Sequence, residues 1–272
     1  MYTLKPIVKN IVIEQLVYAF DTVRPPHFYF SGEAHDFWEI LFIDYGEITA
    51  TADERIYRLD GGKLLFHKPM EFHRVWTDDK PARILTVSFT ASGPLMEYFK
   101  NSCFDLTPTE CEKFSRVSKI FIKARRLYKK GEMEEYSFAS NMAAVLLEEF
   151  LLSLINKPIY SQKHYSQSER QYHHIVNIMK ENCESSLSVD DIAVLSNMST
   201  SNMKRVFSLY SDIGIAKFFL NLKMNRAREL LNNGISPTQI STQLGFNEVS
   251  YFYTVFKRET GMTPAEFCRT KI

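Results

Sequence analysis

Residues 199–214, STSNMKRVFSLYSDIG, decide the fold class of the C-terminal part of this chain. Met203, Val206 and Phe207 follow the i, i+3, i+4 spacing that places apolar side chains on one face of a helix. The opposite face carries an adjacent Lys-Arg pair. The stretch therefore predicts a short helix with one buried face and one basic, polar face.

A second copy of this pattern follows in residues 247–261, NEVSYFYTVFKRETG. There Phe252, Val255 and Phe256 repeat the apolar stripe, and polar residues again occupy the other face. One amphipathic helix with a Lys-Arg pair is common on any solvated helical surface. Two copies of one pattern favour a repeated functional unit.

A short capped helix precedes each copy. SVDDIAVLSNM begins with Ser188 and SPTQISTQLGF with Ser236, and serine is a preferred N-cap residue. Asn197 and Gly245 then stand where each helix must turn, and both tolerate the left-handed conformation. A helix, a tight turn and a second helix with a polar face form the helix-turn-helix motif, whose second helix enters the DNA major groove.

The two predicted motifs, at about 189–208 and 236–258, are joined by AKFFLNLKMNRARELLNNG. Its apolar positions follow a helical period, and Gly234 ends it, so it predicts one long connecting helix. Two recognition helices braced by such a connector can enter successive major grooves, about 34 Å apart.

These stretches resemble the AraC/XylS family of transcription regulators. The resemblance rests on IAVLSNMSTSNMKRVF, NLKMNRARELL and ISTQLGFNEVSYFYTVFKRETGMTPAEFCR. It implies double-stranded DNA and RNA polymerase as partners, and activation of transcription. The family often has Arg where this chain has Thr254, so Arg205 of the first motif is expected to dominate specificity. The candidate DNA-binding residues are Ser201, Asn202, Lys204, Arg205, Ser250, Tyr251, Thr254 and Arg258.

The first half of the chain has a different period. Residues 11–87 contain short β-rich runs, such as FWEILFIDYG and ARILTVSF, divided by turn residues, a pattern typical of a β-sandwich or barrel. After Pro108 the period becomes helical. The predicted buried seam is Phe114, Val117, Phe121, Ala124 and Tyr128. A second helix, SFASNMAAVLLEEFLLSLI, has more apolar surface than one packing face needs, which together with the resemblance favours a homodimer.

HDFWEILFIDYG and GKLLFHKPMEFH resemble the two signature stretches of cupin barrels. His35, Glu39 and His73 stand at three of the four positions that hold metal in metal-binding cupins, and Phe37 occupies the fourth. We therefore expect a small-molecule cavity with no metal and no cofactor. The candidate effector-binding residues are His35, Phe37, Trp38, Glu39, His73 and Trp76.

The predicted fold class is a two-domain α+β protein: a cupin-like β-barrel with dimerisation helices and an all-α double helix-turn-helix domain. We expect an effector-binding and dimerisation domain at 1–155, a polar linker at 156–168 and a DNA-binding domain at 169–272. The predicted function is a sequence-specific DNA-binding transcription regulator, an activator that responds to a small molecule such as a sugar or another catabolic metabolite.

The alternative is a cupin-type metal-dependent enzyme carrying a helical extension. The sequence contains no nucleophile elbow, P-loop or dinucleotide fingerprint, so no catalytic residue is predicted and the chain is not expected to be an enzyme. Analysis of the purified protein for metal would separate the two interpretations.

Composition indicates a protein of the cytoplasm with no membrane partner. The 272-residue chain has a formal net charge of +1, and its four cysteines show no CxxC spacing. The N-terminus lacks the apolar core of a signal peptide. The longest apolar run, AAVLLEEFLLSLI, is interrupted by Glu148 and Glu149 and is too short to span a bilayer.

Overall fold

The β-rich runs of the first half form two sheets in the computed structural model of the chain, which describes residues 5–53, 55–160, 166–211 and 213–269. The chain divides into two units, Met1–Lys163 and His164–Ile272. The strands, all in the first unit, are β1 (Val12–Arg24), β2 (Tyr29–Glu33), β3 (Trp38–Tyr45), β4 (Glu47–Ala52), β5 (Arg55–Asp60), β6 (Lys63–His67), β7 (His73–Trp76), β8 (Ala82–Ser92) and β9 (Cys103–Asp105).

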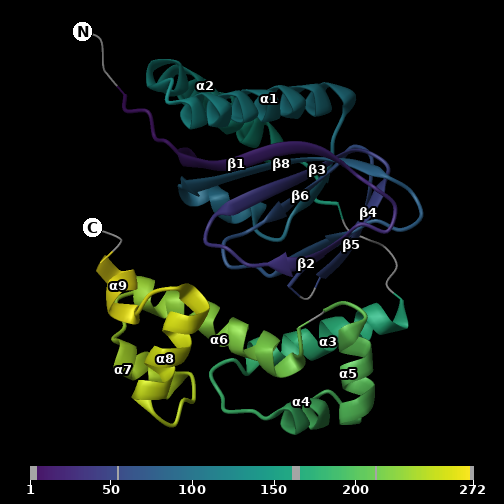
Figure 1. Cartoon of the computed structure of the whole chain (residues 1–272), viewed down its shortest axis with the longest axis vertical. Helices are drawn as coiled ribbons and strands as arrows, with labels where there is room; N and C mark the ends of the chain where they lie inside the picture. The colour runs from purple at the N-terminus through teal and green to yellow at the C-terminus, as the bar shows by residue number, and fades with distance from the viewer. Residues whose placement is uncertain (1–4, 54, 161–165, 212, 270–272) are drawn as a thin grey trace. The chain divides into compact units, whose positions relative to one another are not determined.

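The two antiparallel sheets are stacked, as Figure 1 shows for the first unit. One has the strand order β1-β8-β3-β6-β9 and the other β2-β7-β4-β5. Apolar side chains from both, including Leu41 and Leu65 of the first sheet and Ala50 and Val75 of the second, pack into one cluster between them. Successive residues of a strand point to opposite faces, so the alternate residues of the first sheet are free to pack elsewhere.

Those alternate residues pack beneath two helices, α1 (Pro108–Lys130) and α2 (Met133–Leu154), which lie side by side in Figure 1. A short 3₁₀ helix, η1 (Pro94–Phe99), precedes them. Ile40 and Phe42 of β3 belong to one buried cluster with Phe114 and Leu147 of the helices. The sheet β1-β8-β3-β6-β9 is thus covered on one face by the second sheet and on its opposite face by α1 and α2.

One member of the predicted α1 seam is wrong. Tyr128 is 59% exposed, whereas Leu127 is buried. The seam continues from Ala124 by a step of three residues, which on a helix of 3.6 residues per turn keeps Leu127 on the buried face.

The helix α2 has an apolar surface on both sides. Phe138, Met142, Val145 and Leu152 are exposed and follow one another at steps of four, three and seven residues, which places them on one stripe. By length and composition α2 could also cross a membrane, and 33% of its most apolar window is buried inside the structure.

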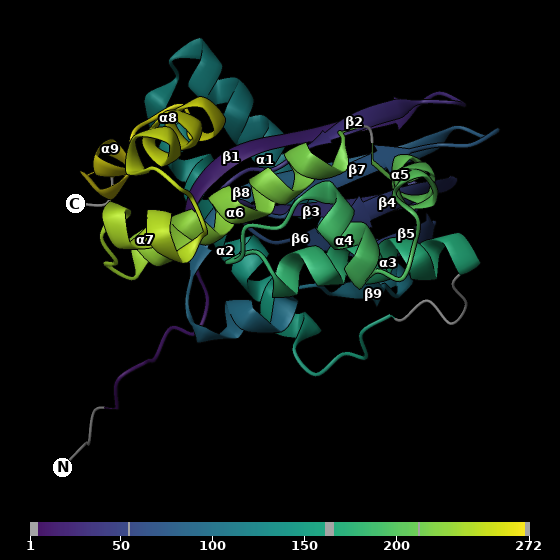
Figure 2. The same ribbon diagram turned by 90° about the horizontal axis from the view of Figure 1, so that it is seen from below.

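The second unit is helical. Its helices are α3 (Gln167–Glu181), α4 (Val189–Leu195), α5 (Thr200–Ser208), α6 (Ile215–Asn232), α7 (Pro237–Gln243), α8 (Val249–Thr260) and α9 (Pro264–Arg269). In Figures 1 and 2, α6 runs between the group α3–α5 and the group α7–α9. The long connecting helix predicted from the sequence is confirmed.

The capping residues predicted from the sequence are also confirmed. Ser188 and Ser236 cap α4 and α7, and in each helix the third residue inside the cap bonds back to the serine. Asn197 and Gly245 adopt φ values of 53° and 71°, in the left-handed region. Residues 161–165 of the predicted linker lie outside the described residues, and α3 begins before the domain start predicted at 169.

Candidate functional site

The first unit contains a cavity of about 360 Å³ between its two sheets. Its aromatic lining residues are Tyr18, Phe20, Phe28 and Phe30, and its charged or titratable ones include Arg24, Glu33, Glu39, His73 and Arg125. An apolar, aromatic cavity with a few converging polar groups is the usual form of a small-molecule site.

A polar cluster around Glu39 lines part of this cavity. The Tyr18 hydroxyl donates a hydrogen bond to Glu39 Oε2, and Ser88 Oγ donates to the same oxygen over 3.2 Å. His73 Nε2 lies 3.5 Å from Glu39 Oε1, and His35 Nε2 lies 3.9 Å from Glu39 Oε2. Glu39 itself is only 5% exposed.

These side chains come from both sheets. Glu39, Tyr18 and Ser88 belong to β3, β1 and β8 of the first sheet, whereas His73 belongs to β7 of the second. His35 lies in the loop between β2 and β3. The cluster therefore forms only when the two sheets pack face to face.

The charges in this cluster follow from burial and contact. Burial and the neighbouring His73 lower the pKa of His35 to about 4, so its ring is neutral at neutral pH. Burial would raise the pKa of the Glu39 carboxyl, but its contacts with His73, His67 and Tyr18 lower it to about 2. Burial and the nearby Glu39 raise the pKa of Tyr18 well above its ordinary range, so its hydroxyl remains protonated and donates.

A buried ion network lies behind His73. The ring of His67 stacks on that of His73 with 4.2 Å between centroids, and His67 Nδ1 lies 3.0 Å from Glu71 Oε2. Glu71 also accepts a hydrogen bond from Lys68 Nζ over 2.6 Å. Burial would raise the pKa of the Glu71 carboxyl, yet His67 and Lys68 lower it to about 2. The stacking of His67 on His73 thus packs one face of the His73 ring.

The structure brings His35, Glu39 and His73 together, and of the predicted effector residues Glu39 and His73 line the cavity. Trp38 is buried in the cluster beneath α1 and α2, on the face of β3 opposite Glu39. Val75 of β7 lines the cavity, so the next residue, Trp76, points to the opposite face of the strand. Strand alternation sends both tryptophans away from the cavity, which corrects their predicted place there.

Phe37, also predicted as an effector residue, stacks on the ring of His35 with 3.8 Å between centroids. Its edge meets Tyr18. Phe37 thus supports the polar cluster and is not a lining residue of the cavity among those that the structure describes.

Sequence reasoning missed Tyr18, Phe20 and Glu33. Tyr18 and Phe20 stack at i and i+2 on one face of β1, a period-2 signal readable in QLVYAF. Glu33 pairs with His73 across β2 and β7, and this pairing between strands distant in sequence leaves no local signal.

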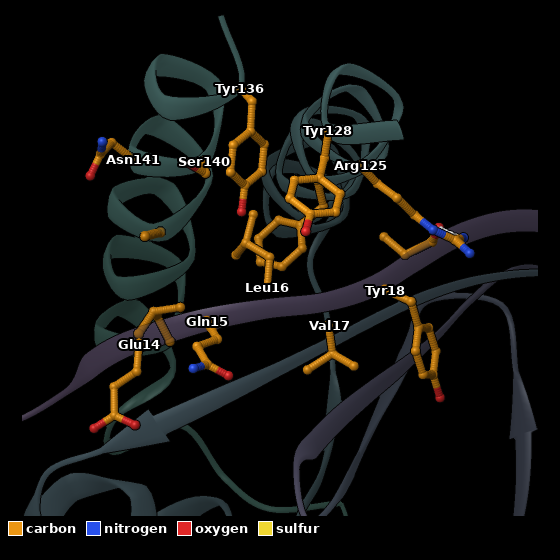
Figure 3. A pocket seen from close by; sticks show the side chains of 14 residues that line it. Glu14, Gln15, Leu16, Val17, Tyr18, Arg125, Tyr128, Tyr136, Ser140 and Asn141 are labelled. Carbon is orange, nitrogen blue, oxygen red and sulfur yellow. Dashed lines mark hydrogen bonds between the residues drawn. The ribbon is translucent and has the colours of Figure 1, made fainter. Parts of the chain in front are cut away.

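A register shift in β1 explains why Tyr18 reaches the cavity. Strict alternation would place Leu16 and Tyr18 on one face, but the pairing of β1 with β8 is irregular between them. Leu16 packs against Ala124 and Leu127 of α1, and Figure 3 shows Tyr18 pointing from β1 away from the helices.

A second cavity, of about 520 Å³, lies outside the sandwich between β1 and the two helices. Figure 3 shows Arg125, Tyr128, Tyr136, Ser140 and Asn141 on the helix side of it. Its polar groups are spread over one open groove and do not converge as those around Glu39 do.

In the second unit, α5 presents a basic face. Met203, Val206 and Phe207 are buried, whereas Lys204 and Arg205 are exposed. The guanidinium of Arg205 donates to Asn202 Oδ1, three residues earlier, over 3.0 Å. Ser201 is also exposed on this helix, so the four predicted residues of the first motif lie together on its solvent side.

The solvent side of α8 also carries two exposed basic residues, Lys257 and Arg258. Ser250, Tyr251, Thr254 and Arg258 are all exposed. The Thr254 hydroxyl, however, donates to the backbone carbonyl of Ser250 over 3.1 Å, and Arg258 Nε donates to Glu259 over 2.8 Å. The polar groups of this face are therefore partly occupied within the helix.

A buried lysine of α6 bonds to the segment before the first motif and to the turn of the second. Lys223 of α6 is 7% exposed, and its Nζ donates to the carbonyls of Ser185 and Leu244 over 2.6 Å each. Ser185 precedes the first motif and Leu244 lies in the turn of the second. A Cβ on Gly245 would come within 3.0 Å of Ser186 N, so the two segments are in direct contact.

Comparison with known proteins matches both units to described domains. Residues 20–155 match the family model described as an AraC-like ligand binding domain, and residues 192–270 match a helix-turn-helix domain. The Msm operon regulatory protein of Streptococcus mutans is 32% identical over 127 residues, 46% of this chain and 44% of that protein.

Two further proteins resemble nearly the whole chain. The HTH-type transcriptional activator RhaR of Escherichia coli O139:H28 is 22% identical over 251 residues, 90% of this chain and 89% of that protein. The crystal structure of ToxT from Vibrio cholerae O395 is 15% identical and covers 93% of this chain and 98% of that one, with a TM-score of 0.39.

Proposed function

This chain belongs to the AraC family of transcription regulators, with an effector-binding first domain and a DNA-binding second domain, and we propose that it activates transcription in response to a sugar or another catabolic metabolite. The observation that carries this proposal is the cavity between the sheets, in which aromatic and polar groups face one space. The relative RhaR is named an activator, which supports the same direction of regulation here.

The lining of the cavity suits a polyhydroxylated ring. Aromatic faces such as those of Phe20, Phe28 and Phe30 pack against the apolar C–H face of a sugar. Glu39 and His73 accept or donate hydrogen bonds to hydroxyl groups at the polar side. We assign effector binding to these groups and no catalytic role to any residue.

We further propose that the chain binds operator DNA through α5 and α8 as a homodimer. The exposed stripe Phe138, Met142, Val145 and Leu152 on α2 supports pairing with a second copy, because contiguous exposed apolar patches mark interaction surfaces. RNA polymerase as a partner and a place in the cytoplasm follow from the regulatory role.

The test uses the full chain. Duplexes selected from a random library should share one motif, and a sugar that binds the cavity should change the affinity for that motif. Glu39→Gln should weaken the response to the sugar and leave DNA affinity without sugar unchanged. Binding that is indifferent to DNA sequence at moderate salt would contradict the function.

The oligomeric state is tested separately by sedimentation. Val145→Glu places a charge on the exposed stripe and should convert the dimer to a monomer, whereas Lys119→Glu on α1 should not. A wild-type chain that sediments as a monomer would contradict the homodimer.

A further inference from the structure

The helix α1 carries a line of basic residues on its solvent side. The buried residues of this helix, such as Phe114 and Phe121, lie on its opposite side. The basic residues follow one another at steps of three, four, three and four, which places them on one line along the helix over about 21 Å. All of them are exposed, and we call them the basic stripe: Arg116, Lys119, Lys123, Arg126 and Lys130.

The positive charge of the first unit is concentrated on this helix. Pro108–Lys130 holds eight Lys and Arg residues and two Glu residues, a balance of +6. Met1–Lys163 holds 21 basic and 22 acidic residues in all, so the rest of the unit holds 13 and 20, a balance of −7. A unit with almost no net charge therefore has one strongly positive surface.

The charges of the basic stripe are largely uncompensated. Lys130, its last member, pairs with Glu132 over 3.4 Å. Two nearby carboxylates, those of Asp21 and Asp44, both pair with Arg83 instead, over 2.8 and 3.1 Å. Among the residues that the structure describes, no carboxylate lies within ion-pair distance of the other four members of the stripe.

We propose that the basic stripe is a further DNA-binding surface, which contacts backbone phosphates of the duplex beside the operator. Double-stranded DNA carries one negative charge per about 1.7 Å of its axis, so a duplex segment as long as the stripe carries about 12 phosphate charges. The core of a protein–protein interface is apolar and depleted of lysine, whereas this line of the helix holds only charged residues. Such a surface suits phosphates, and it adds affinity without reading bases.

The chain between the two units is long enough for this contact. Since α2 ends at Leu154 and α3 begins at Gln167, the twelve residues between them can span up to about 40 Å. Once the second unit holds the operator, the flanking duplex is present near the first unit at an effective concentration in the millimolar range. Weak phosphate contacts are then populated. This step rests on the proposed function, because it requires an operator bound by α5 and α8.

The test measures the operator affinity of the full chain at several salt concentrations, on a duplex that extends beyond the selected motif. The stripe variant combines Lys119→Gln, Lys123→Gln and Arg126→Gln. The slope of log K against log salt should become shallower by at least about 2, since each phosphate contact contributes about 0.9. At about 0.1 M salt the affinity should fall at least about 10-fold. The preference among single-base operator variants should stay the same, because phosphate contacts carry no sequence information.

Three controls accompany the stripe variant. A control variant combines Lys9→Gln, Lys80→Gln and Lys100→Gln, exposed positions elsewhere in the first unit, and should leave the slope unchanged although the net charge falls equally. Exchanging Lys for Arg and Arg for Lys at the three stripe positions keeps the charge and should keep the wild-type slope. On a duplex trimmed to the selected motif, the wild type and the stripe variant should bind alike. Circular dichroism checks that each variant is folded.

The inference is overturned if the stripe variant and the control variant give the same slope. It is also overturned if the stripe variant keeps the wild-type slope on DNA but loses binding to vesicles that contain phosphatidylserine, which would assign the stripe to a membrane surface. A wild-type chain that selects no operator contradicts the proposed function itself, and the inference falls with it. The two failures are therefore distinguishable.

Discussion

The two helix-turn-helix copies of the second unit share a framework and differ in the surfaces they present. Each first helix has a serine cap, Ser188 or Ser236, and each turn has one residue at positive φ. Each second helix buries an apolar stripe, which includes Phe207 in α5 and Phe256 in α8. Packing is thus conserved between the copies.

Their polar faces are not alike. In α5, the guanidinium of Arg205 donates to the short side chain of Asn202, an exposed hydrogen bond that DNA can replace. In α8, Thr254 is bonded to its own backbone and Arg258 to Glu259. The two copies thus share one framework, while the polar side chains of their second helices differ in how far they are already engaged within the helix.

The largest effect should come from breaking the framework that both copies share. Lys223→Met keeps the aliphatic stem but removes two charge-assisted hydrogen bonds and leaves the carbonyls of Ser185 and Leu244 buried. We expect unfolding of the second unit to become about 2–4 kcal/mol easier, measured by denaturant titration. Operator affinity should fall as well, because the two recognition helices lose their fixed separation.

The matched control is Lys217→Met on the same helix. Lys217 is 46% exposed and pairs with Glu259, so its loss should cost less than about 1 kcal/mol. Equal destabilisation by the two substitutions would show that Lys223 does not hold the copies together.

The next largest effect on DNA affinity should come from removing Arg205 of α5. Arg205→Ala removes a planar donor suited to guanine, and we expect binding to weaken by about 1–3 kcal/mol with relaxed preference at one base position. Affinities for single-base operator variants measure this. A lower melting temperature with unchanged base preference would instead mean that Arg205 only supports its own helix.

The smallest effect on DNA affinity should come from removing the hydroxyl of Thr254 in α8. Thr254→Ala removes a hydroxyl that already donates to Ser250, so binding should weaken by less than about 1 kcal/mol. The same set of operator variants gives the comparison. If this loss matches that of Arg205→Ala and spreads evenly over all positions, the copies are equal readers and the contrast between them is wrong.

Much of the second unit could be predicted from sequence because its signals are local. The caps at Ser188 and Ser236, the turns at Asn197 and Gly245 and the helical periods all lie within a few residues of what they determine. Lys223 shows the limit. A lysine is expected on the surface because of its charge. Lys223 is buried because the segments that contain Ser185 and Leu244, distant in sequence, both pack against α6 around it.

The cavity of the first unit was harder to predict. Its position between two β-rich layers follows from strand periodicity, but its lining depends on pairings between distant strands. One irregularity in β1 decides the side to which Tyr18 points, and the pairing of β2 with β7 brings Glu33 beside His73. The prediction put aromatic residues such as Trp38 in the cavity because the sequence alone does not show to which face of its strand each side chain points.

The bonds of Lys223 to the segment before the first motif and to the turn of the second have a consequence for how the DNA sites of this regulator change. With the recognition helices held at one separation, a base substitution in an operator weakens a single contact. A one-base insertion between the two contacted segments turns one segment by about 34° around the duplex and misaligns a whole helix. Mutational drift in target promoters should therefore conserve the spacing of the two segments more strictly than their individual bases.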